Sequence, residues 1–530
     1  MPCLDYARDP ILATESPNDP PAESVGECNA MNILFIMTDQ QRFDTIAALG
    51  NPHIYTPHLD RLVRRGASFT NAYSPCPVCM AARYCIRTGC TPLTTRCFTN
   101  ALSAPAPGQA DTIAGRTGRY LAATMTRLGY RTFGIGKFHT QPCYEDLGFE
   151  VHLHSEELYD TPANRRRDSY AAFLQKQHPE YAWLEMLMGE RTEMYYMPQL
   201  SPMPAALTVE AWAADRAVEQ IRKKDPRPWF GFVSFIGPHP PFAPPIPFNR
   251  MYDPDRMPNP RRGNLAIDHQ DDYIPWMNHA IWADDINDAH ARVLKARYYG
   301  ELSYIDWCLG RILDAVEKRA DADDTLIGFF SDHGDHLGDH HAWQKESFFE
   351  ASIHVPFLLS WPKRIAANIR RPELVSLIDL FGLATTVAGA PELRDGCDLL
   401  GVLAGQAQPR TRLFSYYGEP GTPLFKIMVR QGDWKYIFLA NGGREQLFNL
   451  AHDPNELHQA CQRHPTIVRD LRCAAVAELS ASTSGRPALK GSDLRAFPFH
   501  QRKCERIYQF DLSRGIHGFP AHPKDVWPAR

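Results

Sequence analysis

Short apolar runs alternate with longer amphipathic segments along most of the chain. The apolar runs lie at residues 32–37, 131–135, 229–235, 325–330 and 355–359. Runs of this kind are typical of strands that are buried on both faces of a parallel sheet. Helical patterns stand between them, at residues 56–66, 121–128, 209–221 and 292–319. This alternation predicts an α/β fold: a large, mostly parallel sheet sandwiched by helices.

The pattern changes from about residue 410. Residues 426–430 and 435–439 look like the two strands of a hairpin, and a helical pattern follows at 466–479. We therefore expect a smaller C-terminal α+β subdomain that is built on a short antiparallel sheet. The predicted organisation is a disordered N-terminal extension over 1–30, a main α/β domain over 31–405, this subdomain over 406–484 and a C-terminal arm over 485–530.

Composition excludes several classes of partner. The chain has 530 residues, of which 22% are charged, and a net charge of −4, so we expect no nucleic acid and no membrane partner. The first thirty residues are acidic, rich in proline and lack a secretory signal pattern, which predicts a cytoplasmic protein. The 13 cysteines are scattered and give no disulfide framework. The basic, aromatic arm has no regular period and is a candidate contact for a homo-oligomer.

Polar side chains come directly after four of the predicted strands. They are Asp39 and Gln40, Lys137 and His139, His239, and Asp332 and His333. An acid after a strand is often only a helix cap, so each residue alone is a weak signal. In open α/β sheets, however, ligands bind at the carboxyl ends of the strands. The repetition therefore predicts an active site at this edge.

Four of these side chains make a predicted metal site. Asp39, Gln40, Asp332 and His333 offer two carboxylates, an amide oxygen and an imidazole. Oxygen-rich ligation suits a hard divalent cation such as calcium. The imidazole makes manganese the second choice, and magnesium stays open.

A cysteine-rich stretch at residues 71–89 completes the candidate chemistry. Cys79 stands in a proline-rich turn before a short helical pattern that Gly89 can end, and Arg83 follows one turn later. A thiol at a helix N-terminus beside a cation is expected to be activated. The alternatives are a buried cysteine that only caps the helix, and a redox pair or half a zinc site with Cys76. No second Cys-x-x-Cys supports the last two.

Taken in order, these motifs resemble the sulfatase family of the alkaline phosphatase superfamily. The family signature Cys-x-Pro-x-Arg corresponds to residues 79–83, where Ala81 replaces the proline. Gly-Lys-x-His, Pro-His-x-Pro and Ser-Asp-His-Gly follow at 136–139, 238–241 and 331–334, and Lys345 comes after them. The resemblance extends from Met31 to Trp361, with a weaker echo near residues 434–456.

The resemblance implies hydrolysis of sulfate esters, of the arylsulfatase kind. A maturation enzyme would convert Cys79 to formylglycine (3-oxoalanine), whose hydrated aldehyde is the nucleophile and a further metal ligand. The other implied roles belong to Arg83, which orients the hydrate, Lys137 and Lys345, which neutralise the sulfuryl oxygens, His239, which protonates the leaving alcohol, and His139, which deprotonates the hydrate.

Two other functions stay open. A phosphonate monoester or phosphodiester hydrolase of the same superfamily would share the metal ligands, but such relatives lack the arrangement of Lys137 and His139. A non-catalytic metal-binding relative would keep Cys79 as a thiol, and Ala81 is the only residue that favours it. Two long insertions, at 152–204 and 238–262, are expected to be either substrate lids or surface excursions. They carry no readable code for the alcohol.

Overall fold

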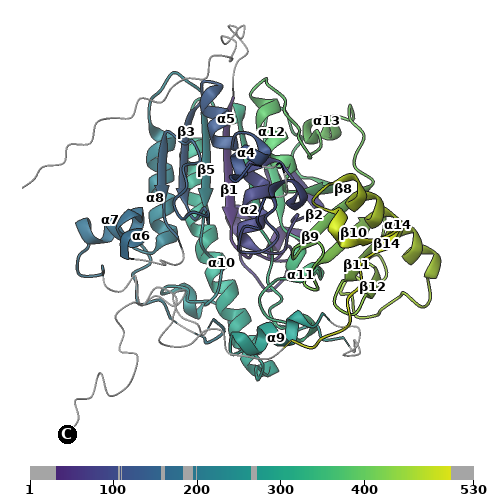
Figure 1. The fold of residues 1–530 in the computed structure, drawn as a ribbon. Coiled ribbons are helices and arrows are strands. Elements are labelled where there is room, and N and C mark those ends of the chain that lie inside the picture. Colours follow the sequence, from purple (N-terminus) through teal and green to yellow (C-terminus); the bar gives the residue numbers. More distant parts are fainter. Residues whose placement is uncertain are drawn as a thin grey trace, which may run out of the picture.

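The computed structural model describes residues 31–502 except 106, 107, 109, 157–161, 183–194, 199 and 264–270. The predicted extension over 1–30 and the end of the predicted arm, 503–530, lie outside the described residues. Two sheets of different size organise the rest, and Figure 1 shows the smaller one at the right with α14 (Pro465–Ala481). No helix of the described residues is long and apolar enough to cross a membrane.

The large sheet has eight strands in the order β4-β3-β5-β1-β6-β7-β2-β8. Their bounds are β1 (Asn32–Thr38), β2 (Ala67–Tyr73), β3 (Arg131–Gly136), β4 (Val151–His154), β5 (Trp229–Ser234), β6 (Thr325–Ser331), β7 (Phe357–Ser360) and β8 (Ile369–Ser376). Neighbouring strands are parallel except where β7 pairs with β6 and β2. The predicted fold is confirmed, and all five apolar runs are strands.

The strand β7 runs against its neighbours because of the loop before it. A parallel neighbour needs a crossover connection that returns the chain to the opposite edge of the sheet. The segment between Ser331 and Phe357 makes no such crossover, and Phe330 pairs with Phe357 at the edge where β6 ends. The chain therefore re-enters the sheet from that edge, and the whole connecting loop stays there.

The central strand β1 shows why helices cover both faces. All seven of its residues are buried, and alternate side chains point to opposite faces. Phe35 packs in a core with α2 (Cys79–Thr88), α5 (Leu121–Arg127) and α12 (Asp379–Val387). Ile36 packs in a second core with α1 (Pro57–Arg65), α8 (Val209–Arg222) and α10 (Asp288–Glu317). The predicted helices agree with these bounds to within a few residues.

Shorter helices lie in the connections and at the surface. They are α3 (Pro92–Thr95), α4 (Ile113–Thr117), α6 (Pro162–Arg167), α7 (Ser169–Gln177), α9 (Tyr273–Ala280), α11 (Glu350–Ile353) and α13 (Leu399–Leu403). The first insertion was predicted to be a loop. It instead contains most of β4, which lies at the edge of the large sheet, and the two helices α6 and α7.

The small sheet is antiparallel, in the order β12-β11-β10-β9. Its strands are β9 (Arg412–Tyr417), β10 (Lys426–Gln431), β11 (Trp434–Leu439) and β12 (Arg444–Asn449), and α14 packs on them. The predicted hairpin and helix are confirmed, whereas β9 and β12 were not predicted as strands. Part of the arm also has regular structure, since β13 (Leu489–Lys490) and β14 (Asp493–Leu494) pair around Gly491, whose φ is +64°. The domain boundaries themselves stay a prediction.

Buried ion pairs tie the small sheet to the loops at the edge of the large sheet. The Nζ atom of Lys435 lies 2.8 Å from Glu350 Oε1, and it also pairs with Glu456. Lys426 Nζ donates a hydrogen bond to the carbonyl oxygen of Glu346 at 2.9 Å. Because Lys345 is the neighbour of Glu346, the small sheet supports the loop that carries a predicted site residue.

Candidate active site

Four parallel strands bring the predicted site residues to one edge. The strands β3, β5, β1 and β6 are consecutive neighbours, so their carboxyl ends lie side by side. Lys137 follows β3, Asp39 follows β1 and Asp332 follows β6 directly, and His239 comes a few residues after β5. The chain topology therefore assembles side chains that are far apart in the sequence.

The guanidinium of Arg83 joins the two carboxylates. Its Nη2 lies 2.8 Å from Asp39 Oδ2, and its Nε lies 2.8 Å from Asp332 Oδ2. The side chains of all three residues are essentially buried. Charged groups held at this distance in a dry interior are fixed in orientation. Arg83 thus leaves the Oδ1 atom of each carboxylate for another partner.

The remaining donor atoms converge on one point. Asp39, Cys79, Asp332 and His333 each offer a ligand atom, and these atoms all lie within 4.8 Å of one another. His333 Nδ1 lies 3.0 Å from the carbonyl oxygen of Gly334, which accepts a hydrogen bond from the Nδ1–H group. Nε2 is then the ring nitrogen with a lone pair for a metal ion. Two carboxylates and a neutral imidazole fit a divalent cation, so the residues present agree with the predicted metal.

The fifth predicted ligand, Gln40, is held by its amide. Gln40 Nε2 donates hydrogen bonds to Asp335 Oδ2 at 2.5 Å and to Gln344 Oε1 at 3.3 Å. Its Oε1 accepts one from Lys345 Nζ at 2.6 Å. The amide nitrogen therefore faces Asp335, and the amide oxygen is the atom turned toward Lys345 and the site.

Asp335 directly follows the Ser-Asp-His-Gly motif, and no role was predicted for it from the sequence. Its side chain accepts hydrogen bonds from Gln40, from the Tyr196 hydroxyl at 2.6 Å and from the backbone N–H of Leu337 at 2.7 Å. Tyr196 belongs to the first insertion, so this insertion reaches the site. The motif spacing alone could not show it, because the contact joins segments that no local pattern relates.

Cys79 is at the first position of α2, as predicted, and Gly89 ends that helix with a φ of +66°. The Sγ atom lies 3.0 Å from His333 Nε2 and accepts a hydrogen bond from Lys345 Nζ at 3.2 Å. The expected activation of the thiol is wrong for this environment. Burial and the carboxylate of Asp39 raise its pKa, and together they outweigh the lowering effect of Lys345 and Lys137. Without a cation, this environment therefore favours the protonated thiol.

Cys76 makes no pair with Cys79. Both are free thiols, and Cys76 Sγ points to the carbonyl oxygen of Phe98 at 3.7 Å. Burial raises the pKa of Cys76 as well. The structure gives no support to the redox and zinc interpretations of this Cys-x-x-Cys.

Lys137 is fully buried, and its ammonium group lies against Asp39, a carboxylate of the predicted metal site. Its Nζ lies 2.6 Å from Asp39 Oδ2. Burial alone would raise the pKa of Asp39, but Lys137 and Arg83 outweigh it and hold this pKa well below its usual value. Asp39 is therefore ionised across the neutral range, as a metal ligand must be.

His139 follows in the same loop and is half-buried. Its φ is +51°, and its backbone N–H donates to Glu156 Oε1 at 2.6 Å. The same oxygen accepts from the N–H of Phe138 at 3.2 Å. Glu156 comes from the first insertion and was not predicted. It holds the loop that carries both Lys137 and His139.

His239 is buried in the segment that follows β5. Its Nδ1 lies 2.8 Å from the carbonyl oxygen of Pro240, which fixes the ring and makes Nε2 the atom available for proton transfer. The ring of Tyr195 meets it edge-on at a centroid distance of 5.6 Å. His239 also acts on Asp39 electrostatically, which places it within range of the carboxylates.

The arrangement can bind a small anionic group. Arg83, Lys137 and Lys345 bring three positive charges to two carboxylates, and a divalent cation would add two more. Such an arrangement of charges attracts an anion and stabilises charge that develops on its oxygen atoms. The side chains of histidines close by can move protons.

Comparison with known proteins gives consistent results. The sequence matches the family model "Sulfatase" over residues 31–390 and the model "N-sulphoglucosamine sulphohydrolase, C-terminal" over residues 338–475. It is 27% identical to an arylsulfatase of Clostridium perfringens over 87% of this chain and 97% of that protein. It is 29% identical to a choline-sulfatase of Rhizobium meliloti over 84% of this chain and 86% of that protein.

Solved structures share the fold over most of its length. A phosphonate monoester hydrolase of Agrobacterium radiobacter superposes with a TM-score of 0.71 at 25% identity, covering 85% of this chain and 95% of that one. A second one, from Silicibacter pomeroyi, gives 0.69 at 22% identity, covering 88% and 99%.

Proposed function

The chain belongs to the sulfatase family, and we propose that it hydrolyses sulfate esters with a formylglycine made from Cys79 and one divalent cation. The observation that carries this proposal is the position of Cys79. Its Sγ lies beside His333 and Lys345, while Arg83 holds Asp39 and Asp332 next to it. The side chain of residue 79 is thus placed both to touch a cation and to attack a bound anion.

An unmodified thiol is a poor candidate for this attack. The side chain of Cys79 is buried, and the nearest carboxylate, Asp39 Oδ1, is 3.6 Å from Sγ. A buried thiol beside a carboxylate keeps its proton, and the neutral thiol is a weak nucleophile. Formylglycine supplies a hydrated aldehyde in its place, with hydroxyl oxygens that suit a hard cation. The Sγ atom stands where one of these oxygens would be.

Asp39, Gln40, Asp332 and His333 would hold the cation, with calcium as our first choice and manganese or magnesium as alternatives. When bound, it polarises an oxygen of the sulfate ester. The protein does the rest of the positioning. Arg83 fixes both carboxylates, Asp335 fixes the amide of Gln40, and Gly334 fixes the tautomer of His333.

Lys137 and Lys345 face the space in which the sulfate would lie. Both ammonium groups are buried, so water does not screen them as it would at the surface. Each can neutralise a sulfuryl oxygen as charge develops on it. This is the role that the family resemblance gave them.

Two histidines would move the protons of the reaction. We assign to His239 the protonation of the leaving alcohol, because its ring is fixed through Nδ1 and Nε2 is the remaining ring nitrogen. We assign to His139 the removal of a proton from residue 79, because it shares a loop with Lys137 that Glu156 holds in place.

Phosphonate monoester hydrolysis is the second candidate, and one observation bears on the choice. Two phosphonate monoester hydrolases share this fold, one of them at 25% identity. Lys137, which the family resemblance associates with sulfatases and not with phosphonate monoester hydrolases, lies 2.6 Å from Asp39 Oδ2. This contact favours the sulfate ester.

The test compares two chromogenic esters on the purified full chain. We expect 4-nitrophenyl sulfate to be turned over with a higher kcat/KM than 4-nitrophenyl phenylphosphonate. Lys137→Ala should lose most of its activity on the sulfate. A wild-type enzyme that prefers the phosphonate, with little effect of Lys137→Ala, would favour the second candidate. The maturation enzyme, the homo-oligomer and the cytoplasmic location expected from the sequence stay predictions.

A further inference from the structure

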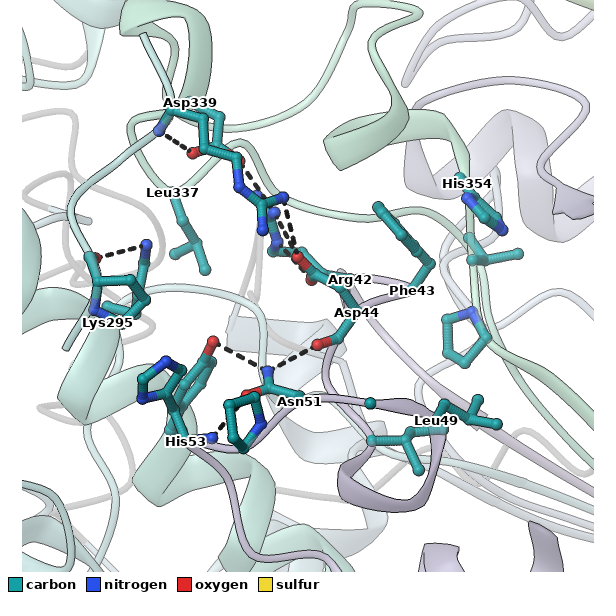
Figure 2. Close-up of a pocket in the computed structure, with 18 of the residues that line it drawn as sticks. Arg42, Phe43, Asp44, Leu49, Asn51, His53, Lys295, Leu337, Asp339 and His354 are labelled. Atoms are coloured by element: carbon teal, nitrogen blue, oxygen red, sulfur yellow. Dashed lines mark hydrogen bonds and ion pairs between the residues drawn. The ribbon is translucent and has the colours of Figure 1, made fainter. Parts of the chain in front are cut away.

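A second cavity lies away from the candidate active site, beside α10. Its volume is about 420 Å³, and none of the proposed catalytic or metal-binding residues lines it. We call it the Lys295 cavity. Figure 2 shows Lys295 on one side of it, with Phe43, Leu49 and His354 across from that lysine. The space is in the range of sites that hold small organic ligands, about 300–1,000 Å³.

The carboxylates of this cavity are already paired. Asp44 and Asp339 line it, and Arg42 lies 2.8 Å from Asp44 Oδ2 and 2.9 Å from Asp339 Oδ2. Arg42 is itself buried, and its Nη1 also donates to the carbonyl oxygens of Asp335 and His336. Figure 2 shows the bonds of Arg42 to its two acidic partners. Neither carboxylate is therefore free to neutralise another cation fully.

Lys295 is a buried cation without a carboxylate. It stands on α10, is 7% exposed, and its Nζ donates to the carbonyl oxygen of Pro258 at 2.9 Å. It forms no ion pair with any residue of the described part of the chain. Burial lowers its pKa to about 8, so most of these side chains are charged at neutral pH at a cost in desolvation. An anion beside Nζ would remove that cost.

The rim adds positive charge. Arg370 is exposed, donates to the carbonyl oxygen of Ala48 at 3.2 Å and makes no ion pair with a described residue. Arg261 reaches Asp44 only at 3.9 Å. Four cationic and two acidic side chains thus line the cavity, which leaves an excess of two positive charges. A neutral ligand would leave that excess uncompensated.

Another part of the lining, which we call the apolar wall, consists of apolar side chains. These are Ile46, Leu49, Phe69, Val355 and Pro356. Phe43 extends this wall and stacks on His354 at a centroid distance of 4.1 Å and an interplanar angle of 9°. A bare inorganic ion would leave most of this surface exposed to water. The wall instead suits the apolar body of an organic molecule.

We propose that the Lys295 cavity binds a small organic anion, with its acidic group at Lys295 and its aromatic or aliphatic body against the apolar wall. The ligand class is a carboxylate, sulfonate or sulfate on an apolar body. This site goes beyond the proposed hydrolysis, since no residue of the catalytic cavity takes part in it.

The test uses naphthalene-2-sulfonate, which has an aromatic body and a carbon–sulfur bond that ester hydrolysis cannot cleave. Its binding to the purified full chain is measured by isothermal titration calorimetry. We expect one binding site in the wild type and binding about tenfold weaker or more in Lys295→Met, the loss typical of a hydrogen bond to a charged group. Methionine has a similar length and is apolar, so the buried position should fold. Neutral 2-naphthol should bind more weakly than the sulfonate.

Two variants serve as controls. Lys318→Met changes an exposed lysine that caps the same helix about 35 Å further along, and it should bind like the wild type. Lys345→Ala alters the catalytic cavity and should also leave this binding unchanged. Arg370→Ala removes an exposed rim cation without risk to the fold, and we expect a smaller loss than in Lys295→Met.

Three results would overturn the proposal. The first is an absence of binding to the wild type at millimolar sulfonate. The second is equal binding in the wild type and folded Lys295→Met. The third is binding that Lys345→Ala abolishes and Lys295→Met leaves intact, because the sulfonate would then occupy the catalytic cavity. The last result would agree with the proposed hydrolase, so the two proposals can fail separately.

Discussion

The catalytic cavity and the Lys295 cavity both contain buried cations, but they arrange them in opposite ways. In the catalytic cavity, Arg83 and Lys137 lie 2.6–2.8 Å from carboxylate oxygens. In the Lys295 cavity, Arg42 pairs with both carboxylates, and the one hydrogen-bond partner of Lys295 among the described residues is a carbonyl oxygen. The catalytic residues are thus bonded to one another, while the Lys295 cavity has a volume of about 420 Å³.

This difference indicates two kinds of site. Charges that are locked to one another keep their geometry when a substrate arrives, and such preorganisation is what catalysis needs. A buried lysine without a carboxylate instead gains most when a ligand supplies the missing negative charge. The contacts of Arg83 therefore indicate a catalytic site. The position of Lys295 away from any carboxylate partner among the described residues indicates a site that binds an anion.

The largest effect is expected when one of the two carboxylates that Arg83 contacts is removed. We expect Asp332→Ala to lower kcat/KM for 4-nitrophenyl sulfate by about 10³-fold or more, because the variant loses a metal ligand and Arg83 loses a partner. The fold should survive, since one loop contributes little to a core of this size. Turnover measures the loss of rate, mass spectrometry measures the metal content, and circular dichroism shows whether the fold survives.

Asp314→Ala is the matched control for that variant. This aspartate is on α10, its side chain is 51% exposed, and it pairs with Arg61 at the surface. It should keep its metal and its rate. Near wild-type turnover of Asp332→Ala in the presence of a strong chelator would show that the metal assignment is wrong.

The second largest effect is expected for His239→Ala on alkyl sulfates. General acid catalysis is worth about 10²–10⁴-fold where the leaving group is a basic alkoxide, and much less for nitrophenolate. Rates across a series of leaving groups measure this, with the 74% exposed His458→Ala as control. Equal losses across the series would remove His239 from the role of acid.

Lys345→Ala should cost about 10²–10³-fold in kcat, the loss typical for one donor to a developing oxyanion. Lys345 is not one of the proposed metal ligands, although its Nζ contacts Gln40 and Cys79, so the metal should stay bound while the rate falls. Lys363→Ala, at an exposed lysine, is the control. If the metal is lost together with the rate, Lys345 acts by positioning Gln40 as a metal ligand and not by neutralising a sulfuryl oxygen.

The smallest effect is expected for Ala81→Pro. Position 81 lies in the first turn of α2, where the missing N–H of proline breaks no helical hydrogen bond. Proline restores the family signature, so the fraction of converted Cys79 should rise by up to a few-fold. Ala81 is fully buried, and the larger ring should lower the melting temperature by a few degrees. Rate and converted fraction should rise together; a higher rate at constant conversion would contradict this.

Much of the fold and of the catalytic cavity could be predicted from the sequence. Buried parallel strands leave continuous apolar runs, and the residue that follows each run must lie at the same edge as the others. This rule was enough to bring Asp39, Lys137 and Asp332 together. The antiparallel direction of β7 could not be predicted, because it depends on where the preceding loop leaves the sheet.

The supporting contacts could not be predicted in the same way. Glu156 and Tyr196 come from an insertion with no readable pattern, and they reach the site only through the tertiary fold. The pKa of Cys79 is raised by burial and by Asp39, and neither effect can be read from the residues around position 79 in the sequence. Lys295 is one of many polar residues on a long helix, and nothing in its spacing marks it.

The most direct test of the central claim is the mass of the tryptic peptide that contains residue 79. Cleavage after Arg65 and Arg83 gives the peptide 66–83, which holds two cysteines, Cys76 and Cys79. After alkylation of active enzyme, we expect one alkylated thiol, at Cys76, and an aldehyde or its hydrate at position 79. Cys79→Ala should be inactive and still bind metal. Fully active enzyme with both thiols alkylated in every copy of the peptide would contradict the account.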